Sequence, residues 1–298
     1  MKRHATFARV DLPTSNVAGA ARFYGDAFGW TFEQPSYPEE RAGAPTLCFV
    51  GSGAPGEDGW LDIAPEVGLV AVDEVPPPGS VGVSIGVDSI EEAFSRIERG
   101  GGRRVHAPEV IDDIRTAVFA DSEGNEIGLW SPGPGADFSW RPHKGAVVAD
   151  GATFQYVQLQ AVILRRAAEF YAEVFGWRFT PPHRSHAPGG PVPSARAALY
   201  GRDVILYCND TRPEVGLLKV DRIAPGAGIG VAIGVDSILA ALDRIERAGG
   251  SICGQQAELD DPCVAMFADS EGNHVSLLAP ARERSVPWRP HLMTDSRM

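Results

Sequence analysis

The residues that could do chemistry in this chain lie on two short segments, one in each half. ATFARVDL carries Arg9 and Asp11, and TFQYVQLQ carries Tyr156 at the corresponding place. Because side chains alternate along a β-strand, Arg9 and Asp11 share one face of the first segment. An arginine can polarise an oxyanion, and an aspartate or a tyrosine can move a proton, so these three are candidate catalytic residues. Alternatively, Arg9 and Asp11 only pair with each other on a solvated strand, which contributes little to stability.

Small and aromatic residues share these faces on neighbouring segments and are candidates for ligand binding. An aromatic-walled cavity with a few polar anchors is what an organic ligand requires. Trp130 has a second interpretation, since a buried tryptophan usually serves packing. The predicted lining residues are Phe7, Gly82, Ser84, Gly128 and Trp130 in the first half, and Phe154, Gln158, Gly230 and Ser276 in the second.

Other chemically capable residues have plainer interpretations. Asp62 and Asp210 stand at matching places before PEVGL, where they could do acid–base work, but turn residues are the favoured interpretation. His274 has no histidine counterpart in the first half, and a lone histidine is more often structural. Cys253 and Cys263 flank a predicted loop, but we expect no structural disulfide between them.

The sequence contains an internal repeat that spans most of the chain. A shift of 148 residues aligns EVGLVAVD (66–73) with EVGLLKVD (214–221), and FADSEGN (119–125) with an identical segment (267–273). A repeat of this length indicates a duplicated domain, not a solenoid, whose units run to about 20–50 residues. WRPH closes both copies, and we expect Trp140 to hold the tail of the first copy across its neighbour. The predicted organisation is a first domain at 1–134, a Gly/Pro-rich linker at 135–152, a second domain at 153–282 and a tail at 283–298.

Each copy contains strands and helices in one order. ATFARVDL alternates like a half-buried strand, and residues 16–30 show the 3/4 spacing of a buried helical stripe. Asn16 is the predicted N-cap of this helix, and Asp88 that of the helix over 88–102. DSEGN is predicted to be the tight turn of a hairpin, where Gly124 supplies a positive φ. Helices and small antiparallel sheets that share one core make an α+β fold.

Composition and charge exclude several functional classes. A hydrophobic content of 44% with 22% charged residues is typical of a globular protein. The formal net charge of −12 argues against a nucleic-acid partner, because phosphate contacts need clustered Lys and Arg. It favours a cationic ligand, although an acidic surface is more often a device for solubility. No apolar run is long enough for a membrane span and no export signal is visible, so we predict a cytoplasmic protein without a membrane partner.

Three motifs, with their counterparts in the second copy, carry a resemblance to a known superfamily. ARFYGDAFGW, GVDSIEEAFSRIERGGG and FADSEGNEIGLW resemble the vicinal oxygen chelate superfamily, which includes glyoxalase I, extradiol dioxygenases and bleomycin-resistance proteins. The resemblance covers nearly the whole chain. It implies two tandem domains, each with two βαβββ modules that form an eight-stranded cup whose floor usually holds a divalent metal. It is compatible with a monomer and with a homodimer, because relatives exchange modules between chains.

The residues at the metal-ligand positions of the superfamily do not suit a metal. A divalent ion needs about three imidazole, carboxylate or thiolate ligands, whereas arginine is a fixed cation and glycine has no side chain. We therefore expect no metal and no other cofactor, and we expect the glycines to widen the cups. The resemblance places the ligand positions at Arg9, Gly82 and Gly128 in the first domain, and at Tyr156, Gly230 and Ser276 in the second.

The sequence leaves binding and catalysis open. The first hypothesis is a metal-independent protein that binds a small organic molecule, aromatic or cationic, as the drug-sequestering members of the superfamily do. The alternative is a metal-free isomerase, lyase or cyclase of specialised metabolism, in which Arg9 stabilises an oxyanion and Asp11 or Tyr156 moves a proton. The ligand positions disfavour a metal-dependent glyoxalase or dioxygenase, and the glycines disfavour a scaffold with degenerate cups.

Overall fold

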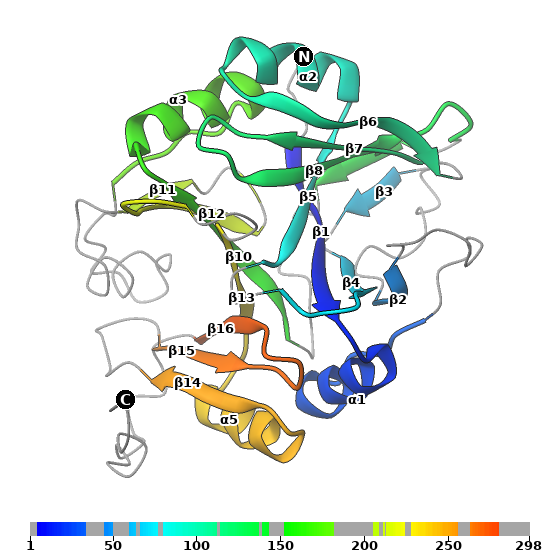
Figure 1. Ribbon diagram of the computed structural model, residues 1–298, viewed down its shortest axis with the longest axis vertical. Coiled ribbons are helices and arrows are strands. Elements are labelled where there is room, and N and C mark those ends of the chain that lie inside the picture. The colour runs from blue at the N-terminus through cyan, green and yellow to red at the C-terminus, as the bar shows by residue number, and fades with distance from the viewer. Residues whose placement is uncertain are drawn as a thin grey trace.

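The chain forms two seven-stranded β-sheets, one from each half, in a computed structural model (Figure 1). This confirms the α+β class and the tandem arrangement predicted from the sequence. Of the eight strands expected in each cup, seven join each sheet in the described part of the chain. The described residues are 5–33, 45–49, 60–63, 66–76, 80–111, 114–136, 139–142, 152–181, 205–208, 211, 213–223, 228–255 and 263–279.

The first sheet joins its two strand sets at β1 and β5. Strand β1 pairs in parallel with β4 and antiparallel with β5, and β5 pairs in parallel with β8. The order across the sheet is β2-β4-β1-β5-β8-β7-β6. Its strands are β1 (Ala5–Thr14), β2 (Pro45–Phe49), β4 (Glu66–Ala71), β5 (Gly82–Val87), β6 (Arg103–Ile111), β7 (Ile114–Ala120) and β8 (Glu126–Pro132).

The second sheet repeats this topology strand for strand. Its order is β11-β12-β10-β13-β16-β15-β14, with β10 in the place of β1 and β13 in the place of β5. Its strands are β10 (Thr153–Ala161), β11 (Ile205–Cys208), β12 (Glu214–Lys219), β13 (Ile229–Gly234), β14 (Ser251–Gln255), β15 (Cys263–Ala268) and β16 (His274–Ala279).

Two further strands, β3 (Trp60–Ile63) and β9 (Ser139–Pro142), pair in parallel outside both sheets. Strand β9 lies inside the segment 135–152 that the sequence predicts to be a linker, so part of this segment pairs with the first half. Asp62 is a strand residue in β3, in register with Arg141. The interpretation of Asp62 as a turn residue is therefore wrong.

Four helices in the described ranges cover the sheets, and the sequence predicts an N-cap for two of them. The Asn16 side chain caps the first helix by accepting a hydrogen bond from the Gly19 amide, as predicted. The second helix is capped by Ser89, which accepts from the Glu92 amide, and not by Asp88 one residue earlier. No helix in the described ranges is long and apolar enough to cross a membrane. The helices are α1 (Val17–Phe28), α2 (Ile90–Arg99), α3 (Leu164–Phe175) and α5 (Ile238–Arg247).

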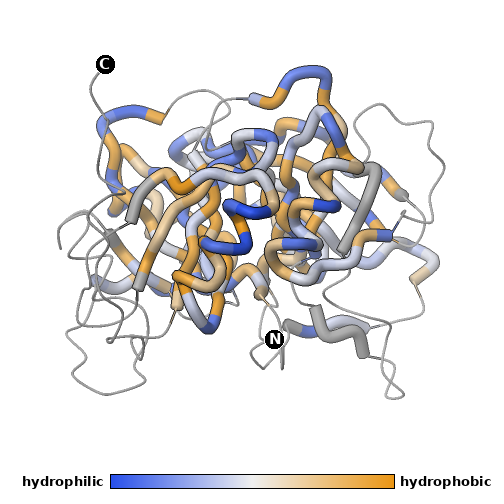
Figure 2. The backbone as a smooth tube through the Cα atoms, turned by 90° about the horizontal axis from the view of Figure 1, so that it is seen from below, coloured by the Kyte–Doolittle hydropathy of each residue, from blue (hydrophilic) through white to orange (hydrophobic). Residues whose placement is uncertain are grey.

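One apolar core joins both halves. Helix α1 packs against α5, and α2 packs against α3, so each helix pair contains one helix from each half (Figure 1). Phe7 of β1 contacts Trp177, with ring centroids 5.4 Å apart, and Phe154 of β10 contacts Trp30 at 5.6 Å. Figure 2 shows hydrophobic segments throughout the packed part of the backbone. We call the side of each sheet turned away from this shared core its cup face.

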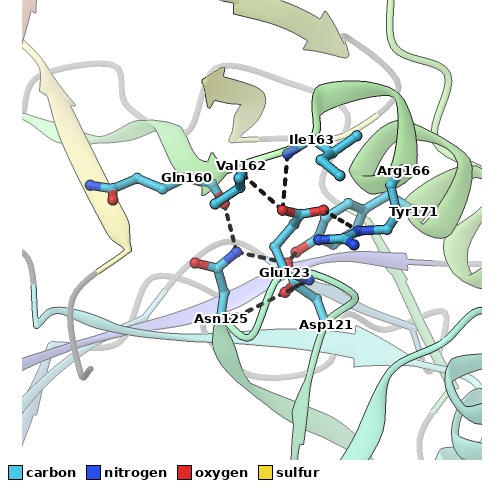
Figure 3. Close-up of polar contacts among 8 residues, drawn as sticks. All are labelled: Asp121, Glu123, Asn125, Gln160, Val162, Ile163, Arg166 and Tyr171. Carbon is cyan, nitrogen blue, oxygen red and sulfur yellow. Dashed lines mark hydrogen bonds and ion pairs between the residues drawn. The ribbon is translucent and has the colours of Figure 1, made fainter. Parts of the chain in front are cut away.

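The DSEGN turn of the first half is buried against the second half (Figure 3). Within the turn, the Asp121 carboxylate accepts hydrogen bonds from the backbone amides of Glu123 and Asn125. It accepts another from the Tyr171 hydroxyl of α3, at 2.6 Å. The Asn125 side chain donates to the backbone carbonyl of Gln160 in β10. The repeated segment is therefore both a hairpin turn and a contact between the two halves.

Glu123 of the same turn caps a helix of the other half (Figure 3). Its carboxylate accepts hydrogen bonds from the backbone amides of Val162 and Ile163, and it pairs with Arg166 at 2.7 Å. Helix α3 begins after Ile163, whose side chain makes no cap hydrogen bond. A carboxylate at a helix N-terminus satisfies free amides and interacts favourably with the helix dipole. The first half thus supplies the N-cap that α3 lacks.

The turn of the second half makes the reciprocal contacts. Asp269 accepts a hydrogen bond from the Tyr24 hydroxyl of α1 at 2.7 Å. Glu271 accepts from the backbone amide and the hydroxyl of Ser15, just before α1. Asn273 donates to a backbone carbonyl of β1. The two halves are therefore held together by two equivalent sets of contacts, in which corresponding residues exchange roles.

We expect Tyr171→Phe to destabilise the fold by about 1–3 kcal/mol, because it removes a donor from a buried carboxylate. Burial already raises the pKa of Asp121, against hydrogen bonds from Asn125 and Tyr171 that act in the opposite direction. Urea unfolding followed by circular dichroism measures the change. Tyr24→Phe is the matched variant in the reciprocal lock and should cost a similar amount. A wild-type unfolding midpoint in Tyr171→Phe would contradict the role of this contact.

Candidate functional site

A β-bulge in β1 decides which residues reach the first cup face. The register of β1 with β5 shifts between Phe7 and Arg9, so that Ala8 is an extra residue. Phe7 is fully buried in the shared core, whereas Ala8 packs with Trp130 and Trp140. Strict alternation predicts that Phe7 shares the face of Arg9, and this prediction is wrong because a bulge interrupts alternation.

The second half contains the same bulge. The register of β10 with β13 shifts between Phe154 and Tyr156. Phe154 is 3% exposed and lies in the shared core, while Gln155 is exposed. Phe154 therefore does not share the face of Tyr156, for the same reason as Phe7.

Four strands of the first sheet each place one residue in a row across the cup face. Arg9 lies in register with Glu66 of β4 on one side and with Ser84 of β5 on the other. Ser84 in turn lies in register with Gly128 of β8. Gly82 is two residues from this row, opposite Asp11. The structure thus brings Arg9, Ser84 and Gly128 together and adds Glu66.

The charged residues of this row interact. Arg9 and Asp11 form an ion pair with Nε 2.6 Å from Oδ1, and their side chains are only 19% and 29% exposed. The pair is therefore partly buried and not fully solvated. Burial raises the pKa of Glu66, the charge of Arg9 lowers it, and the charge of Asp11 raises it further. The first cup face thus holds one guanidinium and two carboxylates whose charges interact.

Glycines give these side chains room. A Cβ atom at Gly68 would overlap the Asp11 carboxylate. One at Gly128 would overlap the Ser84 hydroxyl, and one at Gly82 would lie 3.1 Å from the Asp11 Cβ. Neighbouring side chains therefore occupy the space above these glycines. The expectation that glycines simply widen the cup does not hold at these three positions.

Two tryptophans cover the adjacent part of the first cup face. Trp130 of β8 and Trp140 of β9 pack edge to face, with ring centroids 5.8 Å apart. Both lie over Gly86, where a Cβ would be 3.4 Å from one ring and 3.5 Å from the other. Gly86 is two residues from Ser84 on β5, so the indoles adjoin the charged row. Trp140 packs on its own domain, and the prediction that it reaches across the neighbour is wrong.

The second cup face carries phenols and aliphatic side chains. Tyr156 lies in register with Glu214 and Ala232, and Ala232 with Ser276, which completes the equivalent row. Tyr156 is 2% exposed and contacts the ring of Tyr207, with centroids 6.3 Å apart. The other buried members of this cluster are Leu218, Ala232 and Leu278.

Gln158 and Gly230 lie opposite each other, two residues along from this row. A Cβ at Gly230 would make an ordinary contact of 3.6 Å with the Gln158 Cβ. No neighbouring side chain fills the space next to Gly230, whereas the Ser84 hydroxyl fills the space next to Gly128 in the first half. The second cup face offers hydroxyl and amide groups and the carboxylate of Glu214, with Tyr156 at the place where the first has Arg9.

The donor set of each row does not fit the divalent metal that the superfamily usually holds. The first row contains one carboxylate, one hydroxyl and a guanidinium that is fixed beside it by Asp11. A permanent cation in the row repels a metal ion, and one carboxylate is too few ligands. The second row offers one carboxylate, a phenol and a hydroxyl. Within the described ranges, no three His, Cys, Asp or Glu residues cluster as metal ligands.

Sequence reasoning missed Glu66, Tyr207 and the placement of Trp140 on the first cup face. The signal for Glu66 was present, since EVGL recurs at 66–69 and 214–217 with a glycine in mid-strand. Such a glycine often marks a close approach of another group. Tyr207 has no comparable signal in the sequence. Asp210 and the tail 283–298 lie outside the described residues.

Comparisons with known proteins agree with this architecture. The family model described as a glyoxalase-like domain matches the chain twice, at residues 9–130 and 156–278. A glyoxylase-like domain-containing protein of Didymella fabae is 29% identical over 134 residues, which cover 42% of this chain and 92% of the relative. A Mycobacterium tuberculosis protein provisionally named glyoxylase CFP32 is 25% identical over 297 residues, or 95% of this chain and 97% of the relative.

Solved structures show the same fold at low sequence identity. The Mn(II)-bound glyoxalase from Novosphingobium aromaticivorans has a TM-score of 0.57 at 12% identity, over 94% of this chain and 83% of that one. The 2,3-dioxygenase LapB from Pseudomonas sp. KL28 also has a TM-score of 0.57, at 11% identity, over 94% of this chain and 93% of that one. These similarities establish the fold and leave the ligand to be argued from the residues.

We expect Gly216→Ala to destabilise the protein by about 1–3 kcal/mol in urea unfolding, because the new Cβ would overlap the Tyr156 hydroxyl. The ring of Tyr156 is buried and has little room to move. Gly68→Ala should cost less, since the ends of Arg9 and Asp11 can shift. Gly230→Ala is the control, because its Cβ makes only an ordinary contact. Equal stability of Gly216→Ala and Gly230→Ala would refute this placement of Tyr156.

Proposed function

Because the chain belongs to the family of glyoxalase-like domains, which both of its halves match, we propose that its first cup face binds a small organic cation bearing an aromatic group. The observation that carries the proposal is the charged cluster of Arg9, Asp11 and Glu66 beside the indoles of Trp130 and Trp140. A drug or another specialised metabolite of this class is bound and released unchanged.

The charges of the cluster favour a cation. Asp11 is paired with Arg9, so an ionised Glu66 leaves these three residues with one net negative charge. Glu66 is partly buried, and a carboxylate in such a place gains more from a nearby cation than one in water does. Burial makes the negative charge of the Glu66 carboxylate costly, and a bound cation offsets this cost by supplying a positive charge beside it.

The indoles favour an aromatic or quaternary group next to that charge. Trp130 is only partly buried, so part of its ring surface remains open to a ligand. Cations are attracted to the face of a tryptophan ring, with gains of about 0.5–2 kcal/mol. A ligand that places its positive charge towards Glu66 and its ring towards Trp130 uses both features.

The proposed binding is independent of metal. The ion pair between Arg9 and Asp11 occupies the part of the row where a metal ligand is expected from the family resemblance. Organic side chains alone then hold the ligand. A cytoplasmic location, and a working form that is either a monomer or a homodimer, belong to the same proposal.

The test is calorimetric titration of chelator-treated protein with trimethylphenylammonium, with tert-butylbenzene as the neutral isostere and benzoate as the anion. We expect Glu66→Gln to weaken binding of the cation by about tenfold, which is about 1.4 kcal/mol. Glu214→Gln is the matched control on the second cup face and should leave the affinity unchanged. Equal affinity for the three probes, or binding only after Mn(II) is added, would refute the proposal.

The affinity should also depend on pH in a defined direction. Since the pKa of Glu66 is raised, its carboxyl stays protonated at pH values where an exposed glutamate is already ionised. The cation therefore binds more tightly as the pH rises through this raised pKa, and Glu66→Gln abolishes that rise. A pH profile with the same slope in Glu66→Gln would show that another group is responsible.

The second candidate function is a metal-free isomerase, lyase or cyclase, and the raised pKa of Glu66 beside Arg9 favours it. A carboxyl with a raised pKa keeps its proton to higher pH and can donate it and take it back, while a guanidinium holds an oxyanion. This role adds Glu66 to Arg9 and Asp11 as candidate catalytic residues of the first cup face. Tyr156 lies on the second cup face and does not share this site.

Incubating the cationic compounds with chelator-treated protein separates the two candidates. Recovery of each compound unchanged by mass spectrometry supports binding alone. Turnover that persists in chelator and falls at least about a hundredfold in both Glu66→Gln and Arg9→Ala supports catalysis.

A further inference from the structure

Cys253 and His274 meet on the second cup face. The Cys253 sulfur lies 3.7 Å from Nε2 of His274. The two residues come from β14 and β16, which flank β15, where Ala268 lies in register with Ser251 on one side and with His274 on the other. His274, which the sequence predicts to be structural, thus has a hydrogen-bonding partner in Cys253. Cys253 is also a free, exposed cysteine, in agreement with the expectation that it forms no structural disulfide.

The thiol lies at a β-bulge. Ile252 lies in register with Phe267, and Gly254 with Met266, so Cys253 is the extra residue of β14. Ile252 packs against the shared core, so the side chain of Cys253 after it lies on the cup face. His274 lies on the same face, because Val275 after it is in the core.

Met266 belongs to the same side of the sheet. Its neighbours Ala265 and Phe267 are buried in the shared core, so Met266 points to the cup face, where it is 39% exposed. It lies in register with Gly254, next to Cys253, and is two residues from Ala268, which is in register with His274. A thiol, an imidazole and a thioether are thus gathered on adjacent strands.

The separation of the sulfur and nitrogen atoms suits a shared ion. With metal–sulfur and metal–nitrogen bonds of about 2.3 and 2.0–2.1 Å and an angle of about 110–120°, two ligands of one ion lie about 3.5–3.8 Å apart. The observed distance of 3.7 Å falls in this range. The pair can therefore bind an ion without backbone movement, and the unbranched Met266 side chain can adjust to complete the site.

We propose that Cys253, His274 and Met266 form a binding site for a soft, thiophilic cation, monovalent copper. A thiolate and a thioether select such an ion over Mg²⁺, Ca²⁺ and Mn²⁺, which prefer oxygen ligands. Binding exchanges the thiol proton for the ion, and no electron is transferred. The site does not include any residue of the two rows described above, so it is independent of the proposed function of the first cup face.

The experiment is an anaerobic competition titration of the full chain with Cu(I) against bicinchoninate, with ascorbate as reductant. We expect the wild type to bind one Cu(I) per chain with high affinity. The affinity for Cu(I) should fall at least about a hundredfold in Cys253→Ser. His274→Gln and Met266→Leu should each weaken binding by about tenfold or more. X-ray absorption of the complex should show two sulfur ligands and one nitrogen ligand.

The matched control is His106→Gln, at an exposed position of β6 in the first half, which should bind as the wild type does. Circular dichroism of the copper-free variants checks that each one folds. Two outcomes would overturn the proposal: unchanged affinity in Cys253→Ser, or loss in Cys253→Ser with no change in both His274→Gln and Met266→Leu. The latter describes a single thiol that binds copper adventitiously.

Discussion

The hydrogen bonds that Asp121 and Asp269 accept from tyrosines of the opposite half hold the two sheets in place. Each aspartate also binds the backbone amides of its own turn, so the same carboxylate stabilises the hairpin and the contact between halves. A buried carboxylate without such donors would destabilise the fold. A change of this aspartate is therefore expected to weaken both the hairpin turn and the contact between the halves. This double role gives a physical reason for the identical FADSEGN segments in the two halves.

The contacts between the two halves also determine which side of each sheet is open to a ligand. Because the helices α1 and α5, and α2 and α3, pair across the halves, the two sheets share one core and turn their cup faces away from it. The core side is filled with large aromatic residues such as Phe7 and Phe154. Variation on the cup faces therefore does not disturb the contact between the halves. Arg9 and Tyr156 can differ completely, although the turns behind them are the same.

Much of this fold could be predicted from the sequence, because its signals are local. The buried stripe of α1, its Asn16 cap and the positive φ of Gly124 all depend on a few adjacent residues. Capping by Ser89 in place of Asp88 is a small error, since both residue types cap well and only the geometry decides between them. The partner of the DSEGN turn was not predictable, because Tyr171 is 50 residues from Asp121 and no local pattern links them.

The site was less predictable, because bulges and close approaches decide it. One extra residue in β1 turns Phe7 into the core, and a period-two pattern gives no warning of the bulge. The role of the glycines could not be predicted for a different reason. The space left by a missing side chain is either open or filled by a neighbouring side chain, and the sequence does not distinguish the two. At Gly68 and Gly128 the neighbours occupy that space, so those glycines mark where polar side chains are packed together. Glu66 lies beside one of them, which makes a glycine in mid-strand, repeated in both halves, the sequence feature most useful for locating this site.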